Sequence, residues 1–373
     1  MNWQTLLKSR IRVCAFIVLF LISNILALGS GLTADLVISG AGPGGLAATL
    51  LHARQGKRVI LLEKRSERSD QSLELNEWGS RRRVVQLDPS LYKFLISVGV
   101  SQEIFTSTNL LSYQSSRNLR LHLPLVLPGA RSMASSVFNR TFGPSVIISD
   151  LERELLRLIQ LEKSVEVIFN EKIRDFQERG HRVEILLSGG KTVECGHLLI
   201  AEGKNSPVPE LLEISRIGFG EEKQRLLALL QFENSPKKMG RMLVGGHAVG
   251  EEFLNYALLR SNSTGNLAIV HSGEMHLKPE KHADFIEEVL AKLNLAANIE
   301  ESFLVNTNPH YLERFVSVNG GVSFLGDVAL SVDFSTGAGV SLAIAGAINH
   351  ASNYSDSLFL ERYSANMRLL VEL

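Results

Sequence analysis

The stretch Asp35-Leu-Val-Ile-Ser-Gly-Ala-Gly-Pro-Gly-Gly-Leu46 decides the fold. It opens on an apolar run at residues 36–39, which predicts a strand buried on both faces. The glycine-rich turn leads into a predicted helix at residues 46–55, and residues 59–63 predict a second buried strand. Strand, glycine turn, helix and strand in this order form the βαβ opening of a dinucleotide-binding domain.

Three glycines of the turn, Gly40, Gly42 and Gly45, have the Gly-x-Gly-x-x-Gly spacing of a phosphate-binding turn. Gly40 permits the tight turn, Gly42 lets the backbone approach a pyrophosphate, and Gly45 lets helix and strand pack closely. The helix N-terminus supplies free N–H groups and a partial positive charge to the phosphates. Glu63 ends the second strand, where a carboxylate accepts hydrogen bonds from an adenosine ribose. An acid at this position argues against a phosphorylated ribose.

The rest of the chain predicts a mixture of strands and helices. Alternating apolar residues at 118–128 predict a half-exposed strand, and a helix is expected at 150–161. Short strands separated by Asn, Gly and Ser turns resemble an antiparallel meander inserted into a parallel sheet; they are expected at residues 165–169, 173–177, 183–187, 191–194 and 197–201. Further strands are expected at 226–232, 255–259, 267–271 and 322–325, and helices at 283–293, at 339–351 and from Leu358.

Composition excludes several classes of function. The 39 basic and 39 acidic residues cancel, so no global charge points to nucleic acid as a partner. The ten histidines show no metal-ligand spacing, and the two cysteines, Cys14 and Cys195, are too far apart in sequence to suggest a redox or metal motif. No Gly-x-Ser-x-Gly nucleophile turn is present. Hydrolase and metalloenzyme functions therefore lack support.

The N-terminus has the pattern of a targeting segment. Lys8, Arg10 and Arg12 precede the apolar run at residues 13–28, which fits either a signal peptide or, if extended to Leu32, a membrane anchor. An uncleaved anchor is slightly favoured, because cleavage after residue 34 would cut against the first strand. The basic residues before the run place the body across the membrane, whereas the cofactor pools are cytosolic, so the membrane side stays open.

Two parts of the sequence resemble the class A flavoprotein monooxygenases, the p-hydroxybenzoate hydroxylase-like family. They are Gly40-Ala-Gly-Pro-Gly-Gly45 with Val59-Ile-Leu-Leu-Glu-Lys-Arg65, and Val322-Ser-Phe-Leu-Gly-Asp327 with Thr336-Gly-Ala-Gly339. In that family the second part holds the ribityl chain of FAD through its aspartate, here Asp327. Its glycines let the next helix N-terminus face the flavin. The resemblance therefore implies FAD as the cofactor.

A third part, His-Leu-Leu-Ile-Ala-Glu-Gly-Lys-Asn-Ser-Pro-Val at 197–208, resembles the middle motif of the family with two departures. Glu202 replaces the usual aspartate before Gly203, and Pro207 or Val208 stands where an arginine is expected. In the family this motif serves both flavin and nicotinamide. The departures weaken the expectation of NAD(P)H as electron donor more than that of FAD.

The resemblance also implies FAD contacts at two positions for which a structural role is an open alternative. Arg82 or Arg83 matches a family arginine near the start of a helix, but either residue can equally belong to a solvated basic turn. Ser149 matches a polar FAD contact, but a serine before Asp150 is also a natural helix N-cap. No residue is assigned a catalytic role and none a metal. The expected cofactor-binding residues are Gly40, Gly42, Pro43, Gly44, Gly45, Glu63, Lys64, Arg82, Arg83, Ser149, Glu202, Gly203, Gly326, Asp327, Gly337, Ala338 and Gly339.

The predicted fold class is α/β, a Rossmann-type FAD-binding domain with a parallel sheet and an inserted antiparallel-sheet substrate domain. The predicted divisions are 1–34 (signal or anchor), 35–110, 149–206 and 320–373 (FAD-binding domain), and 111–148 and 207–319 (substrate domain). The expected function is a monooxygenase that inserts one oxygen atom from O2 into a small organic substrate through a flavin hydroperoxide, and a lipophilic substrate is one of the open alternatives. Two alternatives stay open: a non-oxygenating reductase or dehydrogenase for a lipid or prenyl substrate, and a flavin-binding protein without turnover.

Overall fold

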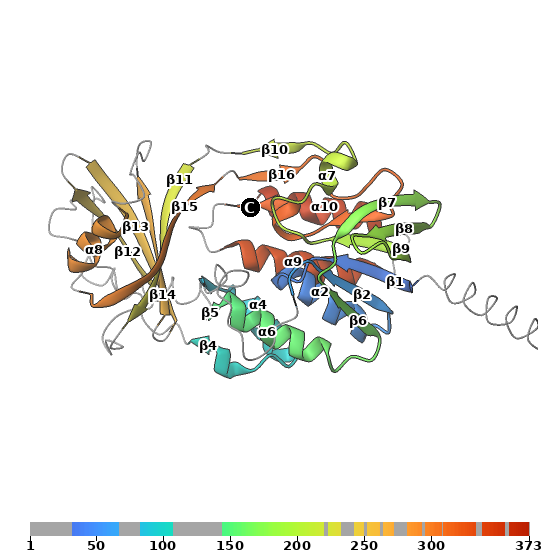
Figure 1. Ribbon diagram of the computed structural model, residues 1–373, viewed down its shortest axis with the longest axis horizontal. Coiled ribbons are helices and arrows are strands. Elements are labelled where there is room, and N and C mark those ends of the chain that lie inside the picture. Colours follow the sequence, from blue (N-terminus) through green and yellow to red (C-terminus); the bar gives the residue numbers. More distant parts are fainter. Residues whose placement is uncertain are drawn as a thin grey trace, which may run out of the picture.

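The computed structural model describes residues 32–66, 83–106, 144–219, 223–232, 242–249, 252–261, 264–271, 282–292, 295–307, 309–332, 338–354 and 358–372. They form two parts that lie side by side (Figure 1). One part is a mostly parallel sheet with helices, and the other is an antiparallel sheet with one helix on its outer face. The predicted α/β fold class is thereby confirmed. The predicted N-terminal segment and the predicted strand at 118–128 lie outside the described residues.

The larger sheet contains the predicted βαβ unit. Its strand order is β6-β2-β1-β9-β8-β7, with β17 paired to β9. The parallel strands are β1 (Leu32–Ser39), β2 (Val59–Glu63), β6 (Val165–Phe169), β9 (Thr192–Ile200) and β17 (Val322–Phe324). The hairpin of β7 (Ile173–Arg179) and β8 (Arg182–Leu187) adds an antiparallel edge. All parallel strands therefore end at the same edge as the glycine turn.

Two predictions about this sheet were wrong. Residues 165–169 were expected in the meander, but β6 pairs in parallel with β2, because the preceding helix returns the chain to the free edge of β2. Residues 191–194 and 197–201 were expected as two strands, but β9 runs through both. Gly196 joins them: a Cβ there would lie 3.0 Å from the Asp35 carbonyl oxygen, so the glycine allows the strands to approach closely.

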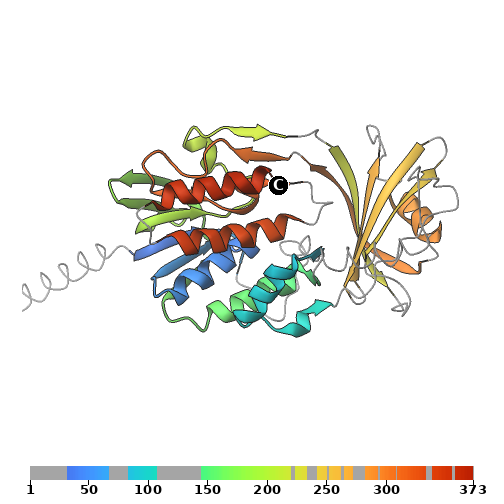
Figure 2. The same cartoon turned by 180° about the vertical axis from the view of Figure 1, so that it is seen from behind.

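Helices cover both faces of the sheet. On one face lie α2 (Pro43–Arg54), α4 (Pro89–Ser97), α6 (Ile148–Ile159) and α9 (Ala338–Asn353), which bury Leu36 and Ile38 of β1. On the other face, Val37 packs in a cluster that includes Tyr363 of α10 (Phe359–Glu372). Figure 2 shows the two red helices, α9 and α10, side by side, and the two are in contact. The predicted helix at 46–55 starts earlier, at Pro43, because proline at the first helical position is preorganised for a helix.

The second part is a five-stranded antiparallel sheet of order β12-β13-β14-β11-β15. Its strands are β11 (Lys223–Phe232), β12 (Met242–Val249), β13 (Glu252–Ser261), β14 (Thr264–His271) and β15 (Ala297–Thr307), and α8 (His282–Lys292) packs on β15. Residues 226–230 of β11 are each at most 2% exposed, so both faces of this strand are covered. The sequence did not predict β12 and β15.

Short sheets connect the two parts. One consists of β10 (Arg216–Gly218), β16 (His310–Leu312) and β18 (Leu330–Ser331). The other consists of β3 (Val84–Gln86), β5 (Ser145–Ile147) and β4 (Phe105–Thr106), and β3 and β5 contact β13. Within the described ranges, the remaining short helices are η2 (Gln102–Ile104), α7 (Val208–Leu211) and η4 (Gly326–Val328). The domain boundaries expected from the sequence stay a prediction.

A chain of buried polar side chains crosses the core beside α9. His52 Nε2 lies 2.9 Å from His350 Nδ1, and His350 Nε2 lies 3.0 Å from Ser323 Oγ. Ser323 Oγ in turn lies 2.8 Å from His197 Nε2, and all four residues are at most 5% exposed. Burial lowers the pKa of His52 to about 4 and that of His197 to about 3, so the imidazoles are neutral.

Within the ranges that the structure describes, no helix combines the length and the apolar character needed to cross a membrane.

Candidate dinucleotide site

The glycine turn between β1 and α2 leaves no room for side chains. Gly40 has a φ of +107°, and a Cβ there would lie 2.5 Å from the carbonyl oxygen of Ala201. A Cβ at Gly45 would overlap the carbonyl oxygen of Gly40. Each glycine therefore serves the close packing that the sequence predicts for this turn.

The N-terminus of α2 is built to face an anion. Gly42 is its N-cap residue and provides no side-chain cap, Pro43 occupies the first turn, and this turn contains no acidic residue. An uncapped helix N-terminus presents unsatisfied N–H groups and the positive end of the helix dipole. Both features are suited to bind phosphate oxygens.

The second glycine-containing turn meets the first one. After β17, Gly326 adopts a φ of +72°, and a Cβ on it would lie 3.5 Å from the Cβ of Ala343 in α9. A Cβ at Gly44 in α2 would lie 3.0 Å from the same Ala343 atom. Asp327 is exposed, and its Oδ1 would lie 3.6 Å from a Cβ at Gly339. The two glycine-containing turns and the N-termini of α2 and α9, which are far apart in sequence, therefore lie close together.

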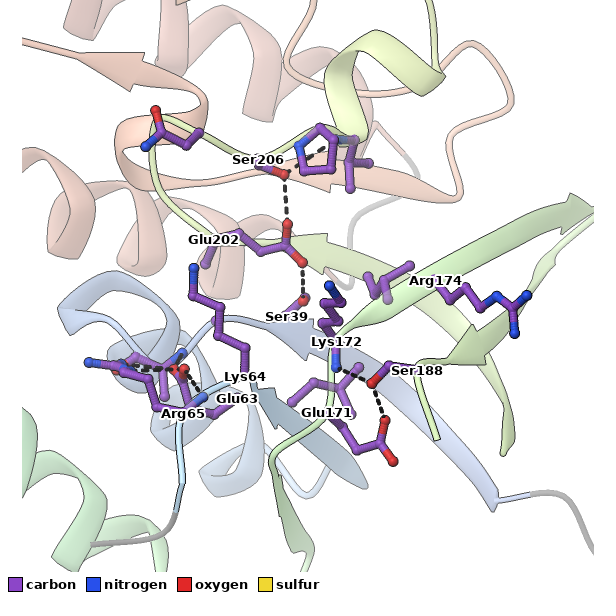
Figure 3. A pocket seen from close by; sticks show the side chains of 18 of the residues that line it. Ser39, Glu63, Lys64, Arg65, Glu171, Lys172, Arg174, Ser188, Glu202 and Ser206 are labelled. Carbon is purple, nitrogen blue, oxygen red and sulfur yellow. Dashed lines mark hydrogen bonds and ion pairs between the residues drawn. The ribbon is translucent and has the colours of Figure 1, made fainter. Parts of the chain in front are cut away.

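A pocket of about 780 Å³ opens beside the first turn (Figure 3). Its lining comes from residues 39–42, 62–65 and 170–174, from Ser188, and from several residues between 201 and 211. These segments follow β1, β2, β6 and β9 at the edge where the parallel strands end. The volume falls within the roughly 300–1,000 Å³ of small-molecule and cofactor pockets.

Glu63 lies at the wall of this pocket and is only 3% exposed. Its Oε2 accepts from the Ala41 N–H at 2.7 Å and from the Arg65 guanidinium at 2.8 Å. Burial alone would raise the pKa of Glu63, but the hydrogen bonds and the charge of Arg65 hold this pKa below its usual value. Glu63 is therefore ionised, and this is the form that accepts hydrogen bonds from ribose hydroxyls most strongly.

At the opposite wall, Glu202 links the end of β1 to the loop that follows β9. Its Oε1 accepts from the Ser39 hydroxyl at 2.5 Å, and its Oε2 accepts from the Ser206 hydroxyl at 2.7 Å (Figure 3). The Arg216 guanidinium, on β10, donates to the Ser206 carbonyl at 2.6 Å. No sequence motif pointed to Arg216, which comes ten positions after Ser206 and reaches the loop only through the fold.

The other expected residues fall into three groups. Lys64 extends into the pocket (Figure 3), and Gly203 follows Glu202 with a φ of +85°. Arg83 and Ser149 come together because the Ile148 N–H donates to the Arg83 carbonyl at 2.9 Å. Ala338 begins α9, whereas Arg82 and Gly337 lie outside the described residues.

The expected N-cap role of Ser149 was wrong. α6 begins at Ile148 with Ile147 as its N-cap residue, so Ser149 lies within the first turn and is 6% exposed. The strand pairing of Val84 with Ile147 fixes where the helix begins.

A protein-family model, pyridine nucleotide-disulphide oxidoreductase, matches residues 34–347. The chain belongs to this family. A curated relative, 3-hydroxybenzoate 6-hydroxylase 1 of Aquipseudomonas alcaligenes, is 29% identical over 180 residues, which cover 45% of this chain and 40% of the relative. The chain thus matches less than half the length of that relative.

Solved structures share the fold. The p-nitrophenol 4-monooxygenase of Pseudomonas putida superposes with a TM-score of 0.71 at 15% identity, over 90% of this chain and 85% of its own. Aklavinone-11 hydroxylase, solved with FAD and aklavinone, superposes with a TM-score of 0.67 at 20% identity, over 87% of this chain and 62% of its own. The fold expected from the resemblance to class A flavoprotein monooxygenases is confirmed, and FAD is the cofactor that the convergent turns and the pocket fit.

The family name includes disulphide chemistry, for which Cys195, the cysteine within the described residues, is not suited. The chain has two cysteines, Cys14 and Cys195. Cys195 is 2% exposed, and burial raises the pKa of its thiol to about 12. A buried thiol that stays protonated is not a nucleophile for disulphide exchange.

Proposed function

We propose that this protein is an FAD-dependent monooxygenase that inserts one oxygen atom from O2 into a small organic substrate. The observation that carries the proposal is the meeting of the two glycine turns with the N-termini of α2 and α9, next to a separate antiparallel sheet. A family relative that hydroxylates an aromatic acid, by its name, supports the same reaction class.

Three parts of this chain would each bind a different part of FAD. The α2 N-terminus would hold the pyrophosphate, Glu63 the adenosine ribose, and Asp327 the ribityl chain. Bound FAD would supply the redox chemistry and the activation of oxygen. The protein contributes orientation and exclusion of water, so no catalytic side chain need stand out in the sequence.

The antiparallel sheet is the proposed substrate-binding part. β13 and β14 contact β3, which leads from the Arg83 region of the cofactor part.

The first test is the absorption spectrum of the purified full chain, followed by identification of any chromophore released on denaturation. A yellow protein that releases FAD is expected. A colourless protein that cannot be reconstituted with FAD would refute the proposal.

The second test follows oxygen itself. The FAD-loaded protein is supplied with NADH or NADPH, ¹⁸O2 and a panel containing 3-hydroxybenzoate, p-nitrophenol and a prenyl alcohol. One ¹⁸O atom in a product is the expected result. Substrate reduction or dehydrogenation without label would instead establish the non-oxygenating reductase or dehydrogenase. Binding of FAD with no turnover of any member would favour the flavin-binding alternative.

We further propose that the apolar N-terminal run, residues 13–28 extended to Leu32, associates the protein with a membrane as an uncleaved anchor. The support is the sequence pattern alone. Alkaline extraction of membranes from cells that express the full chain tests it: the protein is expected in the pellet with its N-terminus intact, and a soluble chain, or one shortened by the segment, would refute it.

A further inference from the structure

Arg65 holds the carboxylate of Glu63 from three directions. Its backbone N–H and its Nε donate to Glu63 Oε1, both at 2.9 Å, and its guanidinium donates to Oε2 at 2.8 Å. The fourth donor is the N–H of Ala41 in the glycine turn. An ionised carboxylate has about four lone-pair sites, so this carboxylate is fully hydrogen-bonded.

The same guanidinium reaches two other elements. It donates to the Ala41 carbonyl at 3.1 Å, so Arg65 and Glu63 together hold both polar groups of that turn residue. It also lies 3.8 Å from Glu152 of α6, one turn after Ser149. Arg65 is 8% exposed and Glu152 2%, which makes this a buried cation between two buried carboxylates.

The charge of Glu63 depends on Arg65. Burial disfavours the charged form of a carboxylate, and a second buried carboxylate nearby disfavours it further. Without the hydrogen bonds and the charge of Arg65, the pKa of Glu63 would rise, and Glu63 would take up a proton at a pH where it is now ionised. Among the described residues, the neighbouring lysine does not take over this role, because Lys64 points into the pocket (Figure 3). The carboxylate of Glu171 accepts from Ser188 and Gly189.

We propose that Arg65 is a positioning residue for the cofactor: it keeps Glu63 ionised and fixed against the glycine turn before FAD binds. Arg65 supplies three of the four hydrogen-bond donors to the Glu63 carboxylate, and the Ala41 N–H supplies the fourth. If a ribose hydroxyl replaced one of these donors, the remaining three would still hold the carboxylate in place. This inference rests on the proposed function, since it assumes that FAD occupies this site.

The test compares FAD affinity of Arg65→Met and the unchanged protein at about pH 6 and about pH 8.5, by quenching of flavin fluorescence. Arg65→Met is expected to weaken binding about tenfold or more at the lower pH, because a protonated Glu63 accepts ribose hydroxyls poorly. At the higher pH, Glu63 ionises again and part of the affinity returns. The unchanged protein should show no such dependence in this interval.

Two further variants make the result specific. Arg65→Lys keeps the cation but loses the forked donors, so its affinity should fall without acquiring the pH dependence; it also serves if Arg65→Met does not fold. Arg58→Met removes a charge from an arginine whose side chain is 65% exposed, outside the pocket, and should bind FAD like the unchanged protein.

Equal affinity of Arg65→Met and the unchanged protein at both pH values would overturn the inference. So would a loss that is the same at both pH values, because ionisation of Glu63 would then not be involved. If the unchanged protein itself binds no FAD, the proposed function fails, and that outcome is distinct from either of these.

Discussion

At the scale of single residues, Asp327 is the position that joins the second glycine turn to α9. The residue before it needs a left-handed backbone, and a Cβ on Gly339 would already touch its carboxylate oxygen. An exposed acid between two glycines in contact with a helix N-terminus is placed to accept hydrogen bonds from a bound polyol chain.

Asp327→Ala is therefore expected to weaken FAD binding by about 1.5–3 kcal/mol, the range for a hydrogen bond to a charged group. Because the side chain is exposed, the free energy of unfolding without cofactor should change little. Equilibrium dialysis with FAD and urea unfolding of the cofactor-free protein measure the two effects. Unchanged FAD affinity would mean that the ribityl chain lies elsewhere.

At the scale of secondary-structure elements, the sequence predicted best where local pattern and tertiary context agree. Residues 59–63 and 165–169 were placed to the residue, because each is a short apolar run bounded by turn signals. The partner of β6 was wrong, since pairing depends on where α6 leads the chain and not on the strand itself. The antiparallel strands β12 and β15 were missed: Gly245 and Gly246 interrupt one, and charged residues at 300–301 interrupt the other.

In the candidate site, too, the sequence predicts what depends on local pattern and misses what depends on tertiary contacts. The glycine positions could be read from spacing, because a close backbone approach admits few other residues. The role of Arg216 could not, because its carbonyl partner is brought to it by the fold. The contact of Arg65 with Glu152 of α6 could not be predicted either, whereas its contact with Glu63 is local in sequence.

Helix starts provide a direct check on these interpretations. Asp88 is the N-cap of α4 and accepts from the Ser90 N–H at 2.7 Å, whereas Ser149 lies inside the first turn of α6. Asp88→Ala is expected to destabilise the protein by about 1 kcal/mol, and Ser149→Ala by less than about 0.5 kcal/mol. Urea unfolding of both variants tests the pair. A larger loss for Ser149→Ala would restore its capping role.

At the scale of the whole molecule, the buried histidines link stability to pH. The folded state keeps the pKa of His52 at about 4 and of His197 at about 3, and it lowers that of His350, against the usual 6.5. The unfolded chain therefore binds more protons below about pH 6.5. The stability that comes from neutral histidines is complete above that pH and is lost as the pH falls toward the folded pKa values.

The free energy of unfolding, obtained from urea titrations between about pH 7.5 and pH 5, should fall by more than about 1 kcal/mol as the pH falls. His52→Gln retains an N–H donor toward His350 but removes one titrating group. The slope of its unfolding free energy against pH should therefore be smaller, by the amount that corresponds to about one proton taken up on unfolding. A decline equally steep in the variant would exclude His52 as a source of the acid sensitivity.

The backbone of Gly320 fixes the donor-to-acceptor direction of the hydrogen bonds that join the buried histidines and Ser323. It forms a hydrogen bond that favours protonated His197, and its own N–H is already donated to the Ser317 carbonyl, so its carbonyl must be the acceptor. His197 then carries its proton on Nδ1 and accepts from Ser323 through Nε2. Ser323 in turn accepts from His350, and His350 accepts from His52.

Every tautomer in the series is thereby fixed, and each N–H or O–H along it has an acceptor. Within the described residues, His52 Nδ1 is the ring nitrogen of the series that has no partner. The first proton to enter this series on acidification is therefore expected at one defined atom of α2, His52 Nδ1.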